Sequence, residues 1–206
     1  MNFGNFELFG IFTKTVALEF EKDILSCIAT LKRGGIILYP TDSVWGIGAD
    51  ATNPAAVKKI FELKQRADGK SMIVLIADAR DINKYVSRPH PYIADYLEKA
   101  KRPTTVIYDG ALGLAENLMG QDGSIAIRIV KEDFCRHLIK RLKKPLVSTS
   151  ANISGTPSPE NFAGISEKIK SGVDYIVEFR QQDNNPAKPS QVIRFTDTGK
   201  PIILRS

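Results

Sequence analysis

The alternation of apolar and polar positions predicts two helices near the start of the chain. Between residues 22 and 33, apolar side chains recur every three or four positions, which is the spacing of one helix face, and Gly34 and Gly35 end the pattern. A second such segment begins at Pro54 and runs to Gln65; proline suits the first turn of a helix, where no N–H donor is needed. The same spacing predicts helices over residues 81–86, 91–100, 133–142 and 159–169.

Short apolar runs between these helices predict strands. The runs cover residues 36–39, 72–76, 105–108, 124–130, 146–148, 175–179, 191–195 and 201–204. Because helices and strands alternate, though not strictly, the expected fold is an α/β domain with a twisted sheet of mixed parallel and antiparallel strands and flanking helices. The polar, turn-rich stretch from Gln181 to Ser190 is interpreted as a mobile loop within that domain.

Length and composition fit one ordinary globular domain. The 206 residues are 43% hydrophobic and 25% charged, which excludes the disordered and fibrous classes. No apolar run approaches the ~20 residues of a membrane span, and the apolar start from Met1 to Phe12 lacks the basic leader and cleavage site of a signal peptide. Cys27 and Cys135 have no zinc-site spacing, so we expect reduced core thiols and a cytoplasmic location.

The positive charge indicates an anionic partner without identifying it. The formal net charge is +6 and the pI is about 9.3, which favours nucleotides, pyrophosphate or RNA. A basic helix that includes residues 136–144 would suit an RNA-binding module. The excess is modest, and many basic proteins bind no nucleic acid, so charge alone leaves these classes open.

Two polar segments follow predicted strands, where α/β sheets place ligands. The first covers residues 39–50 (YPTDSVWGIGAD) and offers the hydroxyls of Thr41 and Ser43 and two glycines that allow close approach of the backbone. A turn with Trp45 in the core explains this segment equally well. The second covers residues 145–155 (PLVSTSANISG) and places five hydrogen-bonding side chains after a core strand, which favours a phosphate or ribose site.

Cations occur at two further places that each allow two interpretations. Lys64, Arg66 and Lys70 lie at or just beyond a predicted helix end, where they complement the helix dipole or clamp a phosphate. The residues alone favour the dipole. Strand alternation places Arg128 on the face opposite the isoleucines of its strand. That face is either wet or lines a pocket for a carboxylate or phosphate, and the residues alone favour the wet face.

Taken in order, these segments resemble the threonylcarbamoyl-AMP synthase family, whose members are called YrdC- or TsaC-like. Members share PT(D/E)xV(Y/F)GLG, KxR, a strand with VRxP, (S/T)SAN-x-SG and a terminal (S/T)T-I…LRPG stretch. This chain has PTDSVWGIG, KQR, AIRIV, STSANISG and SQVI…ILRS in the same order, over roughly residues 20–206. Any one segment is weak evidence, whereas five in order are specific. The length resembles single-domain members, with residues 1–20 as an N-terminal extension of unknown role and residues 21–206 as a YrdC-like domain.

The resemblance implies a sheet curved around a basic concave cavity that holds threonine, bicarbonate and ATP. The implied threonine-binding residues are Thr41, Trp45, Thr105 and Arg128. The implied nucleotide-binding residues are Lys64, Arg66, Ser150, Asn152, Ser190 and Arg205. Catalysis would rest on positioning, with charge stabilised by Lys64, Arg66 and Arg128, and no nucleophile or acid-base residue is assigned. Mg²⁺ would be bound through ATP, with no metal ligand from the protein.

The implied activity is synthesis of threonylcarbamoyl-AMP and pyrophosphate from L-threonine, bicarbonate and ATP. The chain would then be a cytoplasmic nucleotidyltransferase whose product passes to a tRNA threonylcarbamoyl transferase complex for t6A modification of tRNA, with weak contact to tRNA or other RNA left open. His90 and His137 lie outside every motif, which suits a reaction run by positioning. An RNA-binding module and a nucleotide-binding regulatory protein of the same fold remain alternatives.

The chain also departs from the family pattern. Four single residues differ from the family pattern. Ala67 stands in place of the proline after KxR, and Leu75 in place of a histidine of the next strand. Val130 stands in place of the proline of VRxP, and Gln191 in place of the threonine of the terminal pair. The family's PGP turn before Thr105 is replaced by Lys101-Arg102-Pro103, which adds charge and removes a glycine. These differences bear on the threonine pocket and keep the regulatory alternative open.

Overall fold

The computed structural model describes residues 19–66, 72–184 and 188–206. Most of the expected N-terminal extension lies outside these residues, as do Ala67 and Lys70. In chain order the strands are β1 (Ile37–Tyr39), β2 (Gly46–Asp50), β3 (Ile73–Ile76), β4 (Thr104–Tyr108), β5 (Ile125–Ile129), β6 (Leu146–Ser150), β7 (Tyr175–Ile176), β8 (Gln191–Phe195) and β9 (Pro201–Arg205).

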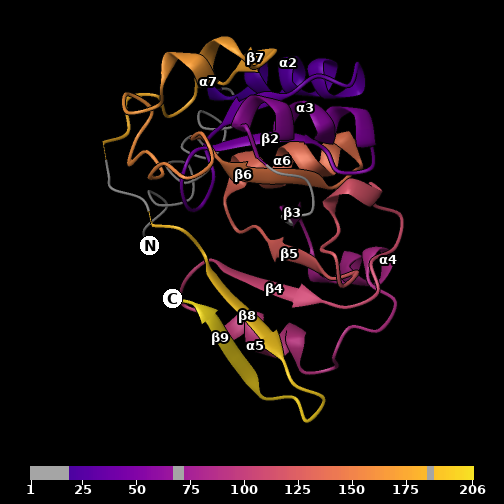
Figure 1. Ribbon diagram of the computed structural model, residues 1–206. Coiled ribbons are helices and arrows are strands. Elements are labelled where there is room, and N and C mark those ends of the chain that lie inside the picture. The colour runs from indigo at the N-terminus through magenta and orange to yellow at the C-terminus, as the bar shows by residue number, and fades with distance from the viewer. Residues whose placement is uncertain (1–18, 67–71, 185–187) are drawn as a thin grey trace, which may run out of the picture.

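These strands form one mixed sheet, which confirms the predicted fold class. Its order is β7-β1-β2-β6-β3-β5-β4-β8-β9 (Figure 1). The pairs β1–β7, β3–β5 and β4–β8 are parallel, and the remaining neighbours are antiparallel. Neighbours in the sheet are therefore often distant in sequence, so motifs that are far apart along the chain lie on adjacent strands.

The helices are α2 (Glu21–Lys32), α3 (Pro54–Lys64), α4 (Ile82–Tyr85), α5 (Ile93–Lys99), α6 (Asp133–Leu142) and α7 (Glu167–Ser171), with 3-10 turns η1 (Ala79–Asp81) and η2 (Glu116–Leu118). In Figure 1, α2, α3, α6 and α7 gather at the half of the sheet that holds β7, β2 and β6. An aromatic cluster helps to hold these helices and the sheet together. The ring centroid of Phe20 lies 5.7 Å from that of Phe134 and 5.1 Å from that of Phe179.

Helix α3 carries one sequence motif to the sheet, and its ends follow from local sequence. The Asn53 side chain accepts hydrogen bonds from the backbone N–H groups of Ala55 and Ala56, which caps the first turn. Lys64 is the last helical residue, and the next residue, Gln65, has a φ of 51°, which lies in the left-handed region. Arg66 N then donates to Phe61 O at 2.9 Å, which closes the C-terminal turn and directs Arg66 away from the helix axis.

The helix predicted over residues 159–169 is wrong for most of its length. Only residues 167–171 are helical, as α7, and residues 160–165 form turns. The reason is local: Asn161 Oδ1 accepts a hydrogen bond from Gly164 N at 3.1 Å, and Ile165 N donates to Phe162 O. Asparagine side chains compete in this way with the helical hydrogen-bond pattern.

Strand β2 was not predicted, and β6 is longer than predicted. All five residues of β2 are buried, and it pairs with β6 from Gly46 opposite Ser150 to Asp50 opposite Leu146. Glycine weakens strands, so its two glycines hid this element from the apolar pattern. The strand predicted over residues 175–179 is likewise shorter, since only Tyr175–Ile176 pair with β1.

Candidate functional site

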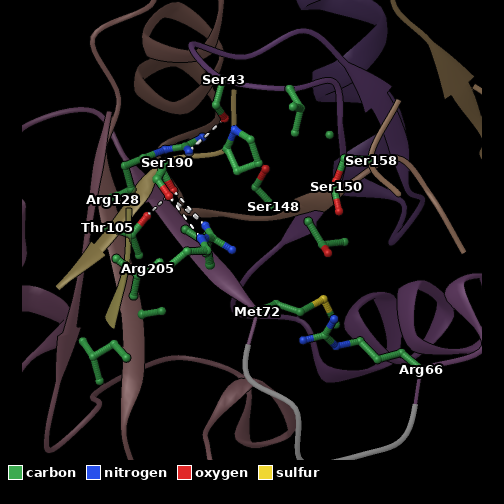
Figure 2. A pocket seen from close by; sticks show the side chains of 18 residues that line it. Ser43, Arg66, Met72, Thr105, Arg128, Ser148, Ser150, Ser158, Ser190 and Arg205 are labelled. Carbon is green, nitrogen blue, oxygen red and sulfur yellow. Dashed lines mark hydrogen bonds between the residues drawn. The ribbon is translucent and has the colours of Figure 1, made fainter. Parts of the chain in front are cut away.

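A cavity of about 280 Å³ opens on the sheet, and seven strands contribute to its lining. Six predicted site residues face it, as Figure 2 shows for the labelled side chains: Arg66, Thr105, Arg128, Ser150, Ser190 and Arg205. Four predicted site residues do not line it: Thr41, Trp45, Lys64 and Asn152. Among the described residues, the lining contains three arginines and no carboxylate.

Arg128 lies on the cavity side of β5, so the interpretation as a wet strand face is wrong. Its side chain is 3% exposed, and Ala126 lines the cavity beside it, as alternation along the strand predicts. Arg128 NH1 donates to Ser43 Oγ at 3.0 Å, and NH2 lies 3.1 Å from Asp42 Oδ1 (Figure 2 shows the Ser43 bond). Two groups from the first motif therefore hold this guanidinium, while its Nε has no hydrogen-bond partner among the described residues.

The wall beside Arg128 joins β4 to the last two strands, since Thr105 pairs in register with Arg128. Thr105 Oγ1 and Ser190 Oγ are 2.9 Å apart and both hydroxyls are buried. Arg205 donates to Ser190 O from Nε at 3.2 Å and from NH2 at 2.9 Å (Figure 2). Burial lowers the pKa of Arg205, and the nearby charges of Arg128 and Arg102 lower it further. Residues from three distant parts of the sequence thus meet in one wall, and its arginine remains cationic at neutral pH.

Thr41 and Trp45 shape the first motif without facing the cavity. Thr41 is 3% exposed; its Oγ1 donates to Val44 O at 2.8 Å and accepts a hydrogen bond from Ser43 N at 3.0 Å. This bonding fixes the turn that carries Ser43 to Arg128. Trp45 is 7% exposed and packs against Phe162 with the ring centroids 4.9 Å apart, which agrees with the core interpretation of this residue.

Lys64 lies beneath the SAN segment rather than in the cavity. Its side chain is among the fully buried ones, and Nζ donates to Ser150 O at 2.5 Å and to Asn152 O at 2.6 Å. A backbone hydrogen bond joins the same two segments, since Ser154 N donates to Lys64 O at 2.9 Å. Burial lowers the pKa of Lys64 to about 8, and the charge of Arg66 acts in the same direction. Lys64 therefore fastens the end of α3 to the loop after β6.

Asn152 is also used inside its own loop. Its Nδ2 donates to Ile153 O at 3.1 Å and to Thr156 O at 2.6 Å. Arg66 does line the cavity, near Met72 (Figure 2), and burial lowers its pKa. Of the two cations of the KxR segment, one therefore holds the loop and the other faces the cavity.

Two glycines of the first motif are required by close packing. A Cβ on Gly46 would lie 2.9 Å from Ser148 Oγ, and one on Gly48 would lie 2.6 Å from Tyr39 Cε1. Both distances are shorter than real Cβ atoms show, so neither position accepts a side chain without movement. The approach of β2 to β6 therefore depends on these residues.

Three lining residues were offered by the sequence only as hydroxyl groups of their segments, with no role assigned: Ser43, Ser148 and Thr149. Sequence reasoning missed a fourth, Ser158. For Ser148 a signal existed: it lies two residues before Ser150 on one strand and so shares its face. Leu75, one of the departures from the pattern of the resemblance, pairs in register with Arg128. Ser158 carries no comparable signal, because it comes from an irregular segment.

Groups suited to covalent or metal chemistry lie elsewhere. His90 stacks on Phe195 with a centroid distance of 5.8 Å, and His137 packs beside Phe20. Cys27 and Cys135 are buried free thiols. Within the described ranges no cluster of histidine, cysteine or acidic residues could hold a metal ion. No described helix is long and apolar enough to cross a membrane.

Comparison with known proteins places this geometry in a family. A threonylcarbamoyl-AMP synthase from Pseudoalteromonas translucida is 31% identical over 161 residues, covering 77% of this chain and 86% of the relative. One from Idiomarina loihiensis is 32% identical over 169 residues, with the same shares covered. The structure of P. abyssi Sua5 complexed with L-threonine matches with a TM-score of 0.77 and 27% identity, covering 90% of this chain and 54% of that one.

A more distant structure supports the fold alone. E. coli YciO matches with a TM-score of 0.75 at 24% identity, covering 90% of this chain and 89% of the other. The sequence model of the Sua5/YciO/YrdC family, described as telomere recombination, matches residues 29–206. The mixed sheet thus agrees with the solved structures. The match of the family model and the curated relatives shows that the chain belongs to the Sua5/YciO/YrdC family.

Proposed function

We propose that this protein is an L-threonylcarbamoyladenylate synthase, a nucleotidyltransferase that forms threonylcarbamoyl-AMP and pyrophosphate from L-threonine, bicarbonate and ATP. One observation carries the proposal: Arg66, Arg128 and Arg205 line a hydroxyl-rich cavity in a chain whose relatives are named threonylcarbamoyl-AMP synthases. Three cations without a lining carboxylate suit a polyanionic substrate. The excess of cations also supports the basic concave cavity expected from the sequence.

The arrangement of the cavity suggests a division of roles. Arg66 and Ser150 lie toward the α3 side, and we assign them to the ATP phosphates, since arginine offers a planar pair of donors. Arg128, held by Ser43 and Asp42, is assigned to the threonine carboxylate. P. abyssi Sua5, whose structure was solved with L-threonine, supports threonine as a substrate for this chain.

Other predicted residues would act through their neighbours. Thr41 and Trp45 would set the turn that positions Ser43, and Lys64 would hold the loop that presents Ser150. Thr105 and Ser190 are assigned to a hydroxyl contact with substrate, and Arg205 to charge neutralisation beside them. Asn152 would fix its loop through bonds to Ile153 O and Thr156 O.

The chemistry needs no nucleophile from the protein. The threonine amine attacks the carbon of bicarbonate and water leaves, which gives a carbamate. A carbamate oxygen then attacks the α-phosphorus of ATP, and the bond from that phosphorus to pyrophosphate breaks. The cavity would place the reactants together, an effect worth ~7–11 kcal/mol when alignment is good, and its arginines would neutralise charge that builds on the phosphates.

Magnesium fits as a partner of ATP rather than of the protein. Since no carboxylate, histidine or cysteine lines the cavity among the described residues, phosphate oxygens would supply the ligands. When bound, Mg²⁺ would neutralise phosphate charge. We propose that the product passes to a tRNA threonylcarbamoyl transferase complex for t6A modification and that the protein acts in the cytoplasm.

Threonine-dependent release of pyrophosphate tests this function. The protein is incubated with ATP, Mg²⁺ and bicarbonate, with threonine, serine or valine, and with each component omitted in turn. We expect release with threonine, little with serine and almost none with valine, because a site that hydrogen-bonds a hydroxyl rejects the analogue without it. Equal release with valine would mean that the amino-acid pocket is misassigned.

The same preparation separates the alternatives. An RNA-binding module would bind RNA with nanomolar affinity at physiological salt and release no pyrophosphate, and its affinity would fall steeply as salt rises. A regulatory protein would bind ATP without turnover. We expect ATP binding that strengthens with threonine and bicarbonate, and no tight binding of RNA at physiological salt.

A further inference from the structure

A second cavity lies behind the first, on the other face of the sheet. Its volume is about 460 Å³, and Thr104 and Ile129 contribute to its lining. These residues are sequence neighbours of Thr105 and Arg128, which line the first cavity. Because successive side chains of a strand point to opposite faces, β4 and β5 separate the two cavities.

The inner wall of the second cavity is apolar. Helix α5 supplies Ala94 and Leu97, and Pro103 and Ile129 add apolar surface from the strand side. The helix is fixed to this face, since the ring of Tyr96 packs edge-on against that of Phe195 in β8 at 5.4 Å. The wall therefore belongs to the packed domain, and its volume is in the range of small-molecule sites, ~300–1,000 Å³.

The rim of the second cavity is charged, and the positive charges are in excess. Lys101, Arg102 and Lys131 line it, together with Glu98 and Asp42. Asp42 is already opposed by Arg128, whose NH2 lies 3.1 Å from Oδ1, so it adds little free negative charge. Within the part of the chain that the structure describes, Lys131 Nζ makes two hydrogen bonds, both long at 3.4 Å, to Leu97 O and Ala100 O.

Two of these cations have no assigned task in the first cavity. Lys101 and Arg102 are exposed, and no ion pair involves either of them within the described residues. They replace the glycine-containing turn expected from the resemblance, so this chain places two positive charges beside an apolar wall. A cation cluster next to an apolar surface complements a molecule with an apolar body and an anionic head.

We propose that the second cavity is a binding site for a small carboxylate with an apolar body. The carboxylate lies at Lys101, Arg102 and Lys131, and the apolar body covers Leu97 and Ile129. The site is separate from the proposed synthase cavity and takes a different ligand, so it goes beyond the proposed function. Asp42 connects the two cavities, since it lines the second cavity and forms an ion pair with Arg128, which lines the first.

The test uses three ligands of equal length with different heads. The full-length ¹⁵N-labelled protein is titrated with hexanoate, hexanol and hexylamine, and amide shifts are followed by NMR. We expect saturable hexanoate shifts that centre on residues 97–104 and 129–131, with affinity at least about tenfold above that for hexanol or hexylamine, because only the carboxylate makes charge-assisted contacts with the three cations. No saturable shifts at these residues, or equal affinity for hexylamine, would overturn the proposal.

Matched variants locate the site independently of the synthase activity. Ala94→Phe fills the cavity from an exposed position, whereas Asp95→Phe adds the same ring one residue away, outside the lining. We expect only Ala94→Phe to abolish the hexanoate shifts, with threonine-dependent pyrophosphate release unchanged in both. The pair Lys101→Gln and Arg102→Gln should weaken hexanoate at least about tenfold, and Lys99→Gln should not. Wild-type hexanoate affinity in Ala94→Phe would refute the assignment.

Discussion

Replacing Lys64 by methionine tests whether this residue holds the loop or contacts phosphate. Methionine keeps the length and the apolar stem but removes the ammonium. In the wild-type protein, Nζ donates to Ser150 O at 2.5 Å and to Asn152 O at 2.6 Å, and Ser154 N donates back to Lys64 O. The substitution therefore leaves Asn152 O without this donor, whereas Ser150 O keeps the hydrogen bond from Asn152 N at 2.9 Å.

Two opposing terms set the size of the effect. Only Asn152 O is left without a donor, at a cost of ~1–3 kcal/mol, about 2 kcal/mol in the middle of that range. Removing the ammonium relieves its burial and its repulsion by Arg66, which together lower the Lys64 pKa from 10.5 to about 8 and are worth roughly 3 kcal/mol. The balance is a gain of no more than about 1 kcal/mol of unfolding free energy. A lysine that did not hold the loop would give the full gain of roughly 3 kcal/mol.

Urea unfolding and amide exchange read out this difference. We expect Lys64→Met to gain no more than about 1 kcal/mol in urea unfolding and to exchange the Ser154 amide faster. Lys59→Met is the matched control: Lys59 is an exposed lysine on the same helix whose Nζ donates to Gly34 O at 2.8 Å, and its loss should change stability by less than ~0.5 kcal/mol. A Lys64→Met protein stabilised by roughly 3 kcal/mol, with unchanged exchange of the Ser154 amide, would refute the reasoning.

The pH dependence of the unfolding free energy gives a second test of whether the Lys64 amine is buried. Because the folded-state pKa of Lys64 lies below the unfolded value, the unfolded chain binds more protons between about pH 8 and 10.5. Wild-type stability should therefore rise with pH across this window relative to Lys64→Met, which has no such group. Parallel stability profiles for the two proteins would contradict the burial of a charged amine.

Three further substitutions address the cavity. Arg66→Ala should weaken ATP binding by ~1.5–3 kcal/mol, measured by calorimetry, whereas a surface residue would change it by less than ~0.5 kcal/mol; wild-type affinity would remove Arg66 from the phosphate site. Gly46→Ala should destabilise the protein by ~1–3 kcal/mol in urea unfolding, since its Cβ would meet Ser148 Oγ at 2.9 Å, and adding Ser148→Ala should recover part of the loss. Asp42→Asn should cost ~3 kcal/mol of stability, because the buried Arg128 loses its counter-charge; an unchanged unfolding midpoint would argue against this pair.

The parts of the fold that could be predicted are those whose pattern is decided locally. Helix α3 has a proline start, an asparagine cap and a periodic apolar face, so its bounds followed from sequence. Strand β2 offered no such pattern, because Gly46 and Gly48 are chosen for the close approach of Ser148 and Tyr39 rather than for strand formation. That approach depends on strands far away in sequence, which a local pattern does not contain.

In the candidate site, too, the sequence pattern predicted where a side chain lies on its strand or helix but not which distant residues it contacts. Alternation along β5 correctly placed Arg128 opposite the isoleucines, but it gave no information on burial, which depends on Asp42 and Ser43 from another segment. The KxR segment was located correctly, yet its two cations are used differently. Lys64 precedes the left-handed residue Gln65 and turns under the loop, while Arg66 follows it and reaches the cavity.

This division has a physical reason that bears on how the motifs are interpreted. A loop that presents hydroxyls and backbone groups to a phosphate must be held before the ligand arrives, since otherwise binding would have to order it. Three side chains meet that need by donating hydrogen bonds to backbone carbonyls of the loops that they hold. Thr41 donates to Val44 O, Lys64 to Ser150 O and Asn152 to Thr156 O. A polar residue in a binding motif can therefore be required for binding without touching the ligand. Loop exchange in the Lys64→Met protein separates these two cases, whereas loss of activity alone does not.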